Sequence, residues 1–316
     1  MDRIDCCPCC GSHAGRDGYA LLSPFIRAWV RPVLQSRSCL IRRCGGCGFL
    51  FFRDRFNSSE MERLYSGYRS SGYLACRRRY EPWYTDAVNG GNLDGVTIAR
   101  RQASLRSFLQ SWLPVDSRHL LAVDVGGDRG QFIPPNLFSR AYLIEASAYP
   151  AWPGVSRISS IQELPCQEDL LMMFSHVLEH LPDPVSFLSR YLSEALGTAC
   201  RRYVYIEVPL ERFRLDSSMS SRLYGRYVRL LDHAWFLPWL MLMDALALLS
   251  RGVIGFLCPP MVLKLHEHLN FFSRQSLISL ADSLGLEILA LEVERQSTLL
   301  SQQGVIRLLA LAKSTP

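Results

Sequence analysis

Two carboxylates accompany a glycine-rich turn near the middle of the chain. The segment LLAVDVGGDRGQF at 120–132 is an apolar run that ends at Asp124 and continues through Gly126, Gly127, Asp128 and Gly130. Glycines at this spacing permit a sharp turn and a close approach of the backbone to a ligand. Carboxylates would repel the pyrophosphate of a dinucleotide, whereas they would attract a cation. S-adenosylmethionine, which has a sulfonium and an ammonium group, therefore suits this turn better than NAD does.

Clustered cysteines near the N-terminus form two C-x-x-C knuckles, CPCCG at 7–11 and CGGCG at 44–48. Four thiolates suit a closed tetrahedral site of the structural kind. The sequence therefore predicts one structural zinc ion held by Cys7, Cys10, Cys44 and Cys47. Cys6 and Cys9 form an overlapping pair with the same spacing and remain the alternative to the first knuckle. Pro8 and Gly11 favour the chosen register.

Histidines and glutamates occur together in two segments, HVLEH at 176–180 and HEHLNFFS at 266–273. The first has the H-x-x-E-H spacing of some zinc hydrolases, in which His176 and His180 would bind metal beside Glu179. That mechanism needs both histidines on one helix face, but Pro182 and Pro184 follow at once. In the second segment, neighbouring titratable groups beside aromatic residues would be costly in a plain core.

Several short runs have the length and the aliphatic content of buried parallel strands. They cover 120–123, 141–145, 155–158, 169–175 and 203–208. Two further runs, at 286–293 and 304–312, can pair as a closing antiparallel hairpin. Pro134 and Pro135 disfavour a long regular helix directly after the glycine turn. The pattern predicts an α/β fold with ligands at the carboxyl ends of the strands.

Three motifs together resemble class I S-adenosylmethionine-dependent methyltransferases: DVGGDRGQF at 124–132, the acid Glu145 at the end of the second strand, and HVLEHLPDP at 176–184. The cysteine knuckles and 266–273 resemble a branch of this family with an N-terminal zinc ribbon that includes sugar C-methyltransferases. The resemblance covers most of the chain except about 212–261. Asp128 stands where the family pattern has its middle glycine. The implied fold is a Rossmann-like, seven-stranded, mostly parallel sheet with an antiparallel last strand, plus a small zinc ribbon.

The resemblance also implies roles for individual residues. The cofactor would contact the glycine turn, and Glu145 would hydrogen-bond the ribose hydroxyls. Further cofactor contacts are expected from Ile161, Ser175 and His176. The base that removes a proton from the methyl acceptor would be His268, supported by Glu267, with His180 approaching from the end of the fourth strand. The alternative is that 266–268 only tie neighbouring segments together.

Charge is uneven along the chain, whose net charge is +6. Residues 1–118 contain 18 Arg and 10 acidic residues, a net charge of +8, whereas 119–316 have a net charge of −2. Guanidinium groups pair well with phosphate, so a phosphate-bearing small molecule is one candidate acceptor. The rival interpretation is a solvated basic face. No apolar leader follows the start, which predicts a cytoplasmic protein.

An apolar run, AWFLPWLMLMDALALL at 234–249, has Asp244 as its only charge and follows several arginines. It is short for a membrane span and contains Pro238. A buried lid helix or a dimer contact through 234–257 is expected first, and a peripheral membrane contact with Trp235 and Trp239 at the interface second.

The predicted organisation is a zinc ribbon at 1–57, a helical connector at 58–115, and a methyltransferase domain at 116–316 with an apolar helical insertion at about 211–260. The predicted function is methyl transfer from S-adenosylmethionine to a small molecule, such as a nucleotide-linked sugar or another metabolite precursor. One rival function is a zinc-ribbon protein that binds nucleic acid, which would show salt-sensitive binding and no cofactor. The other is the zinc hydrolase, which would need a second metal ion.

Overall fold

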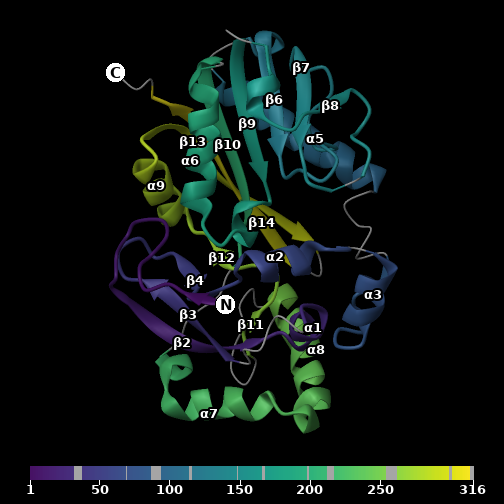
Figure 1. Ribbon diagram of the computed structural model, residues 1–316, viewed down its shortest axis with the longest axis vertical. Coiled ribbons are helices and arrows are strands. Elements are labelled where there is room, and N and C mark those ends of the chain that lie inside the picture. The colour runs from purple at the N-terminus through teal and green to yellow at the C-terminus, as the bar shows by residue number, and fades with distance from the viewer. Residues whose placement is uncertain are drawn as a thin grey trace. The chain divides into compact units, whose positions relative to one another are not determined.

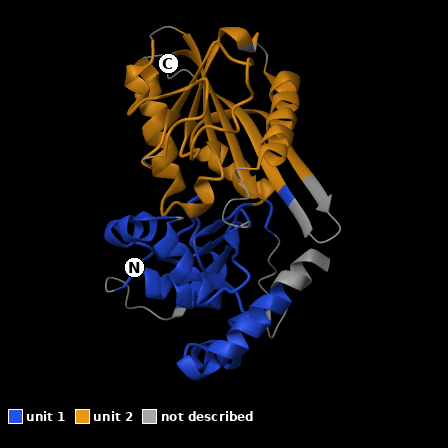
Figure 2. Ribbon diagram, turned by 90° about the vertical axis from the view of Figure 1, so that its right-hand side faces the viewer, with its two compact units in different colours: residues 1–90, 210–272, 295–304 blue, residues 91–209, 273–294, 305–316 orange. Residues whose placement is uncertain are grey.

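The computed structural model describes residues 1–31, 38–68, 70–86, 94–113, 116–147, 149–165, 168–197, 199–211, 217–253, 262–298 and 301–313. The chain divides into two compact units, coloured separately in Figure 2. Unit 1 comprises 1–90, 210–272 and 295–304, and unit 2 comprises 91–209, 273–294 and 305–316.

Unit 2 is built on the predicted seven-stranded sheet, in the order β13-β14-β10-β9-β6-β7-β8. Its strands are β6 (Leu120–Val125), β7 (Arg140–Ile144), β8 (Val155–Arg157), β9 (Glu168–Ser175), β10 (Ala199–Pro209), β13 (Leu286–Thr298) and β14 (Ser301–Ala312). The five strands from β6 to β10 run parallel, and β14 pairs antiparallel with β10. The first five strands therefore follow the Rossmann-like order 3-2-1-4-5. This order confirms the predicted fold class.

Helices cover both faces of this sheet. On one face lies α5 (Gly95–Trp112), and the ring of its Phe108 is 5.8 Å from that of Tyr205 on β10. On the other face lies α6 (Pro184–Glu194), where Tyr191 is 5.9 Å from Phe174 on β9. The last helix of the unit is α9 (Arg274–Ser283). Figure 1 shows these helices beside the sheet.

Residues 126–139, between β6 and β7, form turns and contain no helix. Pro134 and Pro135 lie in this segment and account for its irregular course, because proline cannot donate to a helical ladder. The prediction that no long helix follows the glycine turn is confirmed.

Unit 1 contains a second sheet, with strand order β11-β2-β3-β4-β12. These strands are β2 (Gly15–Leu22), β3 (Ser38–Cys44), β4 (Leu50–Phe52), β11 (Lys264–Leu265) and β12 (Asn270–Phe271). A two-stranded sheet pairs β1 (Asp2–Arg3) with β5 (Asp54–Arg55). Among its described residues, the α-helices of the unit are α1 (Pro24–Trp29), α2 (Ser58–Tyr65), α3 (Ser71–Arg78), α7 (Arg222–Leu231) and α8 (Leu237–Val253).

The expected domain boundaries differ from these units. Residues 264–271 supply both edge strands of the sheet in unit 1: β11 pairs with β2, and β12 pairs with β4. The expected ribbon at 1–57 and the expected insertion therefore share one hydrophobic core, in which Phe25, Leu265 and Leu231 are buried. By contrast, α5, expected in a connector, packs on the sheet of unit 2. The edge strands β11 and β12 are short, and each pairs with a strand from a distant part of the chain. The boundaries of the units therefore do not follow the order of the sequence.

The apolar run at 234–249 forms a short 3-10 turn followed by α8. Pro238 is the second residue of α8, a position at which proline does not interrupt the hydrogen-bond ladder. Among the described residues, no helix combines the length and the apolar character needed to cross a bilayer.

Candidate functional site

The glycine turn at the end of β6 is built from left-handed backbone conformations. Gly126, Asp128 and Gly130 have φ of 72°, 61° and 73°. Asp128 occupies the position at which the family pattern has glycine, and aspartate is one of the few other residues that adopt this conformation readily. Asp128 therefore adopts a conformation typical of glycine while it adds a carboxylate to the turn.

Asp124 lies at the centre of the site with its carboxylate fully buried. Neither carboxylate oxygen has a hydrogen-bond partner among the described residues. Burial, together with the nearby carboxylates of Glu145 and Glu207, raises the pKa of Asp124 to about 7, although Arg101 acts in the opposite direction. A buried carboxylate without donors is costly unless a ligand satisfies it. A cationic ligand would supply that partner, so these residues fit S-adenosylmethionine.

The backbone approaches Asp124 closely. A Cβ atom at Gly127 would lie 1.9 Å from Asp124 Oδ2. Only glycine leaves room for this contact, which explains why the turn needs a residue without a side chain at this position.

Glu145 follows β7 and contacts the same turn. Its carboxylate accepts hydrogen bonds from the backbone N–H groups of Asp128, at 3.3 Å, and Ser147, at 2.8 Å. Because β7 lies beside β6 in the sheet, the strand-end acid and the glycine turn reach one edge, as the sequence predicted. Of the other expected cofactor contacts, Ile161 is fully buried in a 3-10 turn and Ser175 ends β9.

An ionic network that the sequence analysis did not identify surrounds Glu207 on β10. Its Oε1 accepts a hydrogen bond from Arg101 Nη2 at 2.7 Å, and its Oε2 accepts from the Tyr205 hydroxyl and Arg307 Nε, each at 2.8 Å. Glu207 and Arg307 are directly opposite one another on β10 and β14. Despite burial, His176 together with Arg101 and Arg307 holds the pKa of Glu207 well below its ordinary value. One acid in the run YVYIEV at 203–208 and one base in the run VIRLLALA at 305–312 were the available signal.

His176 joins this network with a left-handed backbone, φ 57°. Its Nδ1 is 3.3 Å from Glu179 Oε1, and its Nε2 is 3.2 Å from Glu207 Oε1. Burial lowers the pKa of His176, but the two carboxylates outweigh burial and raise the pKa to about 9. The ring is therefore protonated near neutral pH, and both of its nitrogens face carboxylates.

The segment 178–180 is a single 3-10 turn, and His176 precedes it in the left-handed conformation. His176 and His180 therefore do not lie on one face of an α-helix. A zinc hydrolase that uses His176 and His180 needs that helix, so this geometry argues against the hydrolase mechanism.

The second histidine segment connects β11 to β12 in unit 1. Glu267 accepts hydrogen bonds from the Tyr73 hydroxyl and from Arg77 Nη1, the latter at 3.1 Å. Next to it, His266 Nε2 lies 2.9 Å from Glu81 Oε1. Glu267 and His266 are therefore held by charged and polar neighbours from α3 and the residues after it.

His268 has a different neighbour from Glu267. Its Nδ1 lies 3.3 Å from Glu211 Oε2, and the side chain is about one-third exposed. His180, the third residue of the expected catalytic group, belongs to unit 2, whereas Glu267 and His268 belong to unit 1. The catalytic roles of these three residues stay predictions.

Four cysteines from the two knuckles converge in unit 1. The Sγ atoms of Cys7, Cys10, Cys44 and Cys47 all lie within 4.8 Å of one another. Cys7 Sγ is 3.6 Å from Cys47 Sγ, and Cys10 Sγ is 3.5 Å from Cys44 Sγ. A tetrahedral zinc ion with bonds of about 2.3 Å to sulfur requires separations of about 3.8 Å. The four residues therefore fit zinc, and this group contains Cys7 and Cys10 rather than Cys6 and Cys9.

Each knuckle closes through the glycine that follows it. Gly11 and Gly48 both have φ of 70°, and their N–H groups donate to the carbonyls of Cys7 and Cys44. The glycine that follows each knuckle in the sequence therefore has the same role in both.

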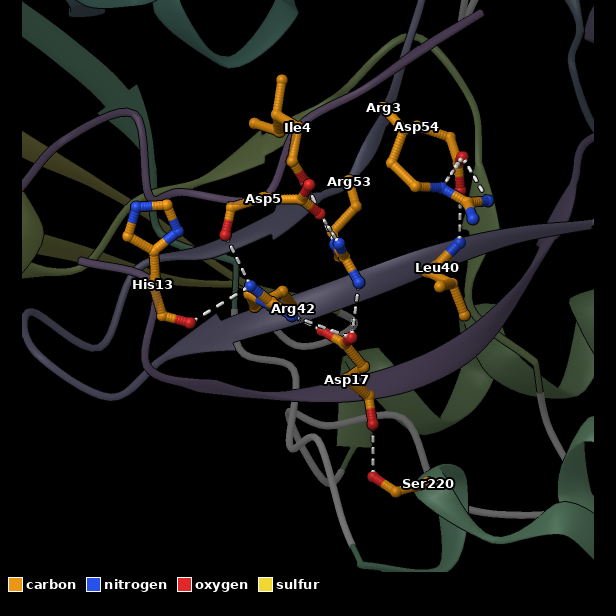
Figure 3. Close-up of polar contacts among 10 residues, drawn as sticks. All are labelled: Arg3, Ile4, Asp5, His13, Asp17, Leu40, Arg42, Arg53, Asp54 and Ser220. Carbon is orange, nitrogen blue, oxygen red and sulfur yellow. Dashed lines mark hydrogen bonds and ion pairs between the residues drawn. The ribbon is translucent and has the colours of Figure 1, made fainter. Parts of the chain in front are cut away.

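Arginines on the neighbouring strands hold the first knuckle in place (Figure 3). Arg42 Nη1 donates to the carbonyls of Asp5, at 2.7 Å, and His13, at 3.3 Å, which bracket the knuckle. Asp17 accepts from Arg42 and Arg53, and these two guanidinium groups lower the pKa of Asp17 despite partial burial. Some of the N-terminal arginines therefore form ion pairs within unit 1.

Comparisons with known proteins give similarity at the level of structure. No family model matches the sequence, and no curated protein matches it. One similar solved structure is 1,6-didemethyltoxoflavin-N1-methyltransferase from Burkholderia thailandensis, with 13% identity over 87% of this chain and 96% of that one, and a TM-score of 0.41. Another is magnesium protoporphyrin IX methyltransferase from Synechocystis PCC 6803, with 15% identity over 78% and 97% of the chains and a TM-score of 0.40.

Proposed function

We propose that this protein transfers a methyl group from S-adenosylmethionine to a small-molecule acceptor. The observation that carries the proposal is the buried carboxylate of Asp124, which lacks a hydrogen-bond partner among the described residues and lies against the glycine turn. Ligands of this fold class bind at the carboxyl ends of the strands, where Asp124 lies.

In this proposal, Asp124, Gly126, Gly127, Asp128 and Gly130 form the cradle for the cofactor, and Glu145 accepts hydrogen bonds from its ribose hydroxyls. Ile161, Ser175 and His176 are the further proposed contacts to the cofactor. The bound cofactor supplies a methyl group that is already activated as a sulfonium. The protein's own residues must therefore orient the acceptor and remove its proton.

His268 is the proposed base. An imidazole can exchange a proton near neutral pH, whereas Glu267 is engaged by Tyr73 and the positively charged Arg77. Glu267 and His180 have supporting roles. The acceptor is a small molecule whose nucleophile needs deprotonation: a carbon beside a ketone would form an enolate, and a hydroxyl would lose its proton during attack. Nucleotide-linked sugars are the first acceptors to test.

Calorimetric titration with S-adenosylhomocysteine tests the cofactor site. We expect Glu145→Ala to weaken binding about 10- to 150-fold, since hydrogen bonds to a charged group contribute about 1.5–3 kcal/mol. Glu287→Ala, which changes an exposed glutamate of the same unit, is the matched control. If the unmutated protein binds no S-adenosyl ligand, or binds NAD more tightly, the proposed function is wrong.

The base is tested once an acceptor is found. We expect His268→Gln to abolish turnover while the affinity for S-adenosylhomocysteine stays unchanged. Normal turnover by a folded His268→Gln protein would assign 266–268 a purely structural role. The structural zinc is proposed separately and takes no part in the reaction.

A further inference from the structure

The helices α7 and α8 of unit 1 expose an apolar surface, which we call the α7–α8 surface. It consists of Leu223, Leu230, Trp235, Trp239, Leu242 and Leu246. Trp235 is 93% exposed and Leu223 is 76% exposed. On α8, Trp239, Leu242 and Leu246 follow one another at helical spacing and therefore form a single stripe.

These side chains are exposed although both helices pack against the rest of unit 1 through other faces. The opposite face of α7 is buried through Tyr224, Val228 and Leu231, and Gly225 lets the helix approach Tyr19 on β2. Leu240 and Met243 are buried on α8 in the same way. The orientation of both helices is thus determined by their buried faces, and the apolar stripe remains on the outside. The first expectation for this run, a buried lid helix or a dimer contact, therefore accounts for the buried face of α8 but does not describe its exposed stripe as buried.

Charge on this surface is positive. Arg222, Arg226 and Arg229 are exposed on α7, and none forms an ion pair with a residue in the described part of the chain. The two acidic residues of 217–253 are both neutralised: Asp232 pairs with Arg27, and Asp244 pairs with Lys264. Exposed tryptophan and leucine next to unneutralised arginine is the pattern of a helix that lies in a membrane interface.

We propose that the α7–α8 surface binds an anionic membrane surface without crossing it. The arginines would meet lipid phosphates, while Trp235 and Trp239 would enter the interface between headgroups and acyl chains. Pairing with a second copy fits less well, because a two-fold contact would bring the arginines of both copies together, and both acids of the described stretch 217–253 are already paired with other residues. This proposal is independent of the methyltransferase assignment.

Vesicle sedimentation with the full chain tests the proposal, using phosphatidylcholine vesicles with and without phosphatidylglycerol. We expect binding only with the anionic lipid, and weaker binding at high salt. Trp235→Ser combined with Trp239→Ser should reduce the partition coefficient by at least about tenfold. Replacing Arg222, Arg226 and Arg229 by Gln should also reduce it by at least about tenfold.

The matched control is Val96→Ser combined with Leu196→Ser, which removes two exposed apolar side chains from unit 2. This control should bind vesicles as the unmutated protein does. Failure to sediment with anionic vesicles, or equal losses in the control, would overturn the proposal. So would a dimer, measured by sedimentation without lipid, that dissociates on the tryptophan substitutions, because that result assigns the surface to a second copy.

Discussion

At the residue scale, the property that we expect to affect ligand binding most is the protonation state of the Asp124 carboxyl group. Burial has the largest effect on this group, and the carboxylates of Glu145, Glu207 and Asp128 add to it, so the pKa rises to about 7 although Arg101 opposes the change. The folded chain therefore holds a proton that the unfolded chain releases near its ordinary pKa of about 3.9. Raising the pH from about 3.9 to about 7 and beyond therefore lowers the free energy of unfolding, because the folded state must then ionise a buried group.

The same group predicts the pH dependence of cofactor binding. A cationic ligand favours the ionised carboxylate, so binding below the pKa must release a proton. We expect the affinity for S-adenosylmethionine to fall about tenfold between about pH 8 and about pH 6. Calorimetry in buffers with different ionisation enthalpies would measure both the affinity and the released proton. In Asp124→Asn, which cannot ionise, this difference in affinity should disappear; an unchanged pH dependence would assign the proton elsewhere.

At the element scale, the turn after β6 can pass close to Asp124 because backbone, rather than a side chain, fills the space beside this residue. Left-handed residues at Gly126, Asp128 and Gly130 give the turn its course. The prolines that follow prevent an ordinary helix from replacing it. The turn is therefore a specific local structure that small changes can disrupt.

Gly127→Ala is the sharpest test of this turn. The added Cβ would lie 1.9 Å from Asp124 Oδ2 and 2.1 Å from its Cγ, so either the turn or the carboxylate must move. We expect a loss of about 1–3 kcal/mol in the free energy of unfolding, as for other overpacked sites, and at least about tenfold weaker cofactor binding. Gly197→Ala is the control, since a Cβ there meets nothing within 4 Å. Full affinity in Gly127→Ala would contradict this account of the turn.

The two cysteine knuckles are the other element with a specific geometry. Purified protein should contain about one zinc ion per chain, as four thiolates in one site imply. Cys7→Ser should lower the zinc content and the melting temperature, because it removes one of the four converging sulfur atoms. The neighbouring Cys6, which is exposed, provides the control. If Cys6→Ser rather than Cys7→Ser lost the metal in elemental analysis, the register of the first knuckle would be wrong.

At the scale of the whole molecule, ionic networks join segments that are far apart in the sequence. In unit 1, Arg77 contacts Tyr73, Glu81 and Glu267, the last of which is 190 residues away. The Arg77 side chain is largely buried, and the attached acids raise its pKa although burial opposes this. The network therefore fastens 264–271 to α3 within one unit.

Arg77→Met should destabilise unit 1 strongly. Removing one partner of a buried ionic group leaves the others uncompensated, at a cost of about 3–5 kcal/mol. Arg78→Met is the control, because Arg78 pairs with Asp86 at an exposed position and such pairs contribute about 0–1 kcal/mol. Chemical denaturation followed by circular dichroism would compare the two variants. Equal stability of the two would show that the network is not a major stabilising feature.

The sequence alone was enough to predict the strands of unit 2, the glycine turn and the pairing of the knuckles. The strands, the turn and each single knuckle depend on residues a few positions apart, so that local sterics and local hydrophobic pattern determine them. The pairing of the two knuckles was predicted from the four thiolates that a structural zinc site needs. Asp124 and Glu145 were predicted at or near the carboxyl ends of two parallel strands, where ligands of this fold class bind. The seven-stranded sheet confirms that reasoning.

The tertiary structure alone decided which charged residues meet and which segments share a core. Glu207 contacts Arg101 and Arg307 across sequence separations of 106 and 100 residues. Residues 264–271 complete a sheet whose central strands lie near the N-terminus. The exposed stripe of α8 looked like a core segment in the sequence. Hydrophobicity is nondirectional, and the identity of the buried face depends on partners that only the folded chain brings together.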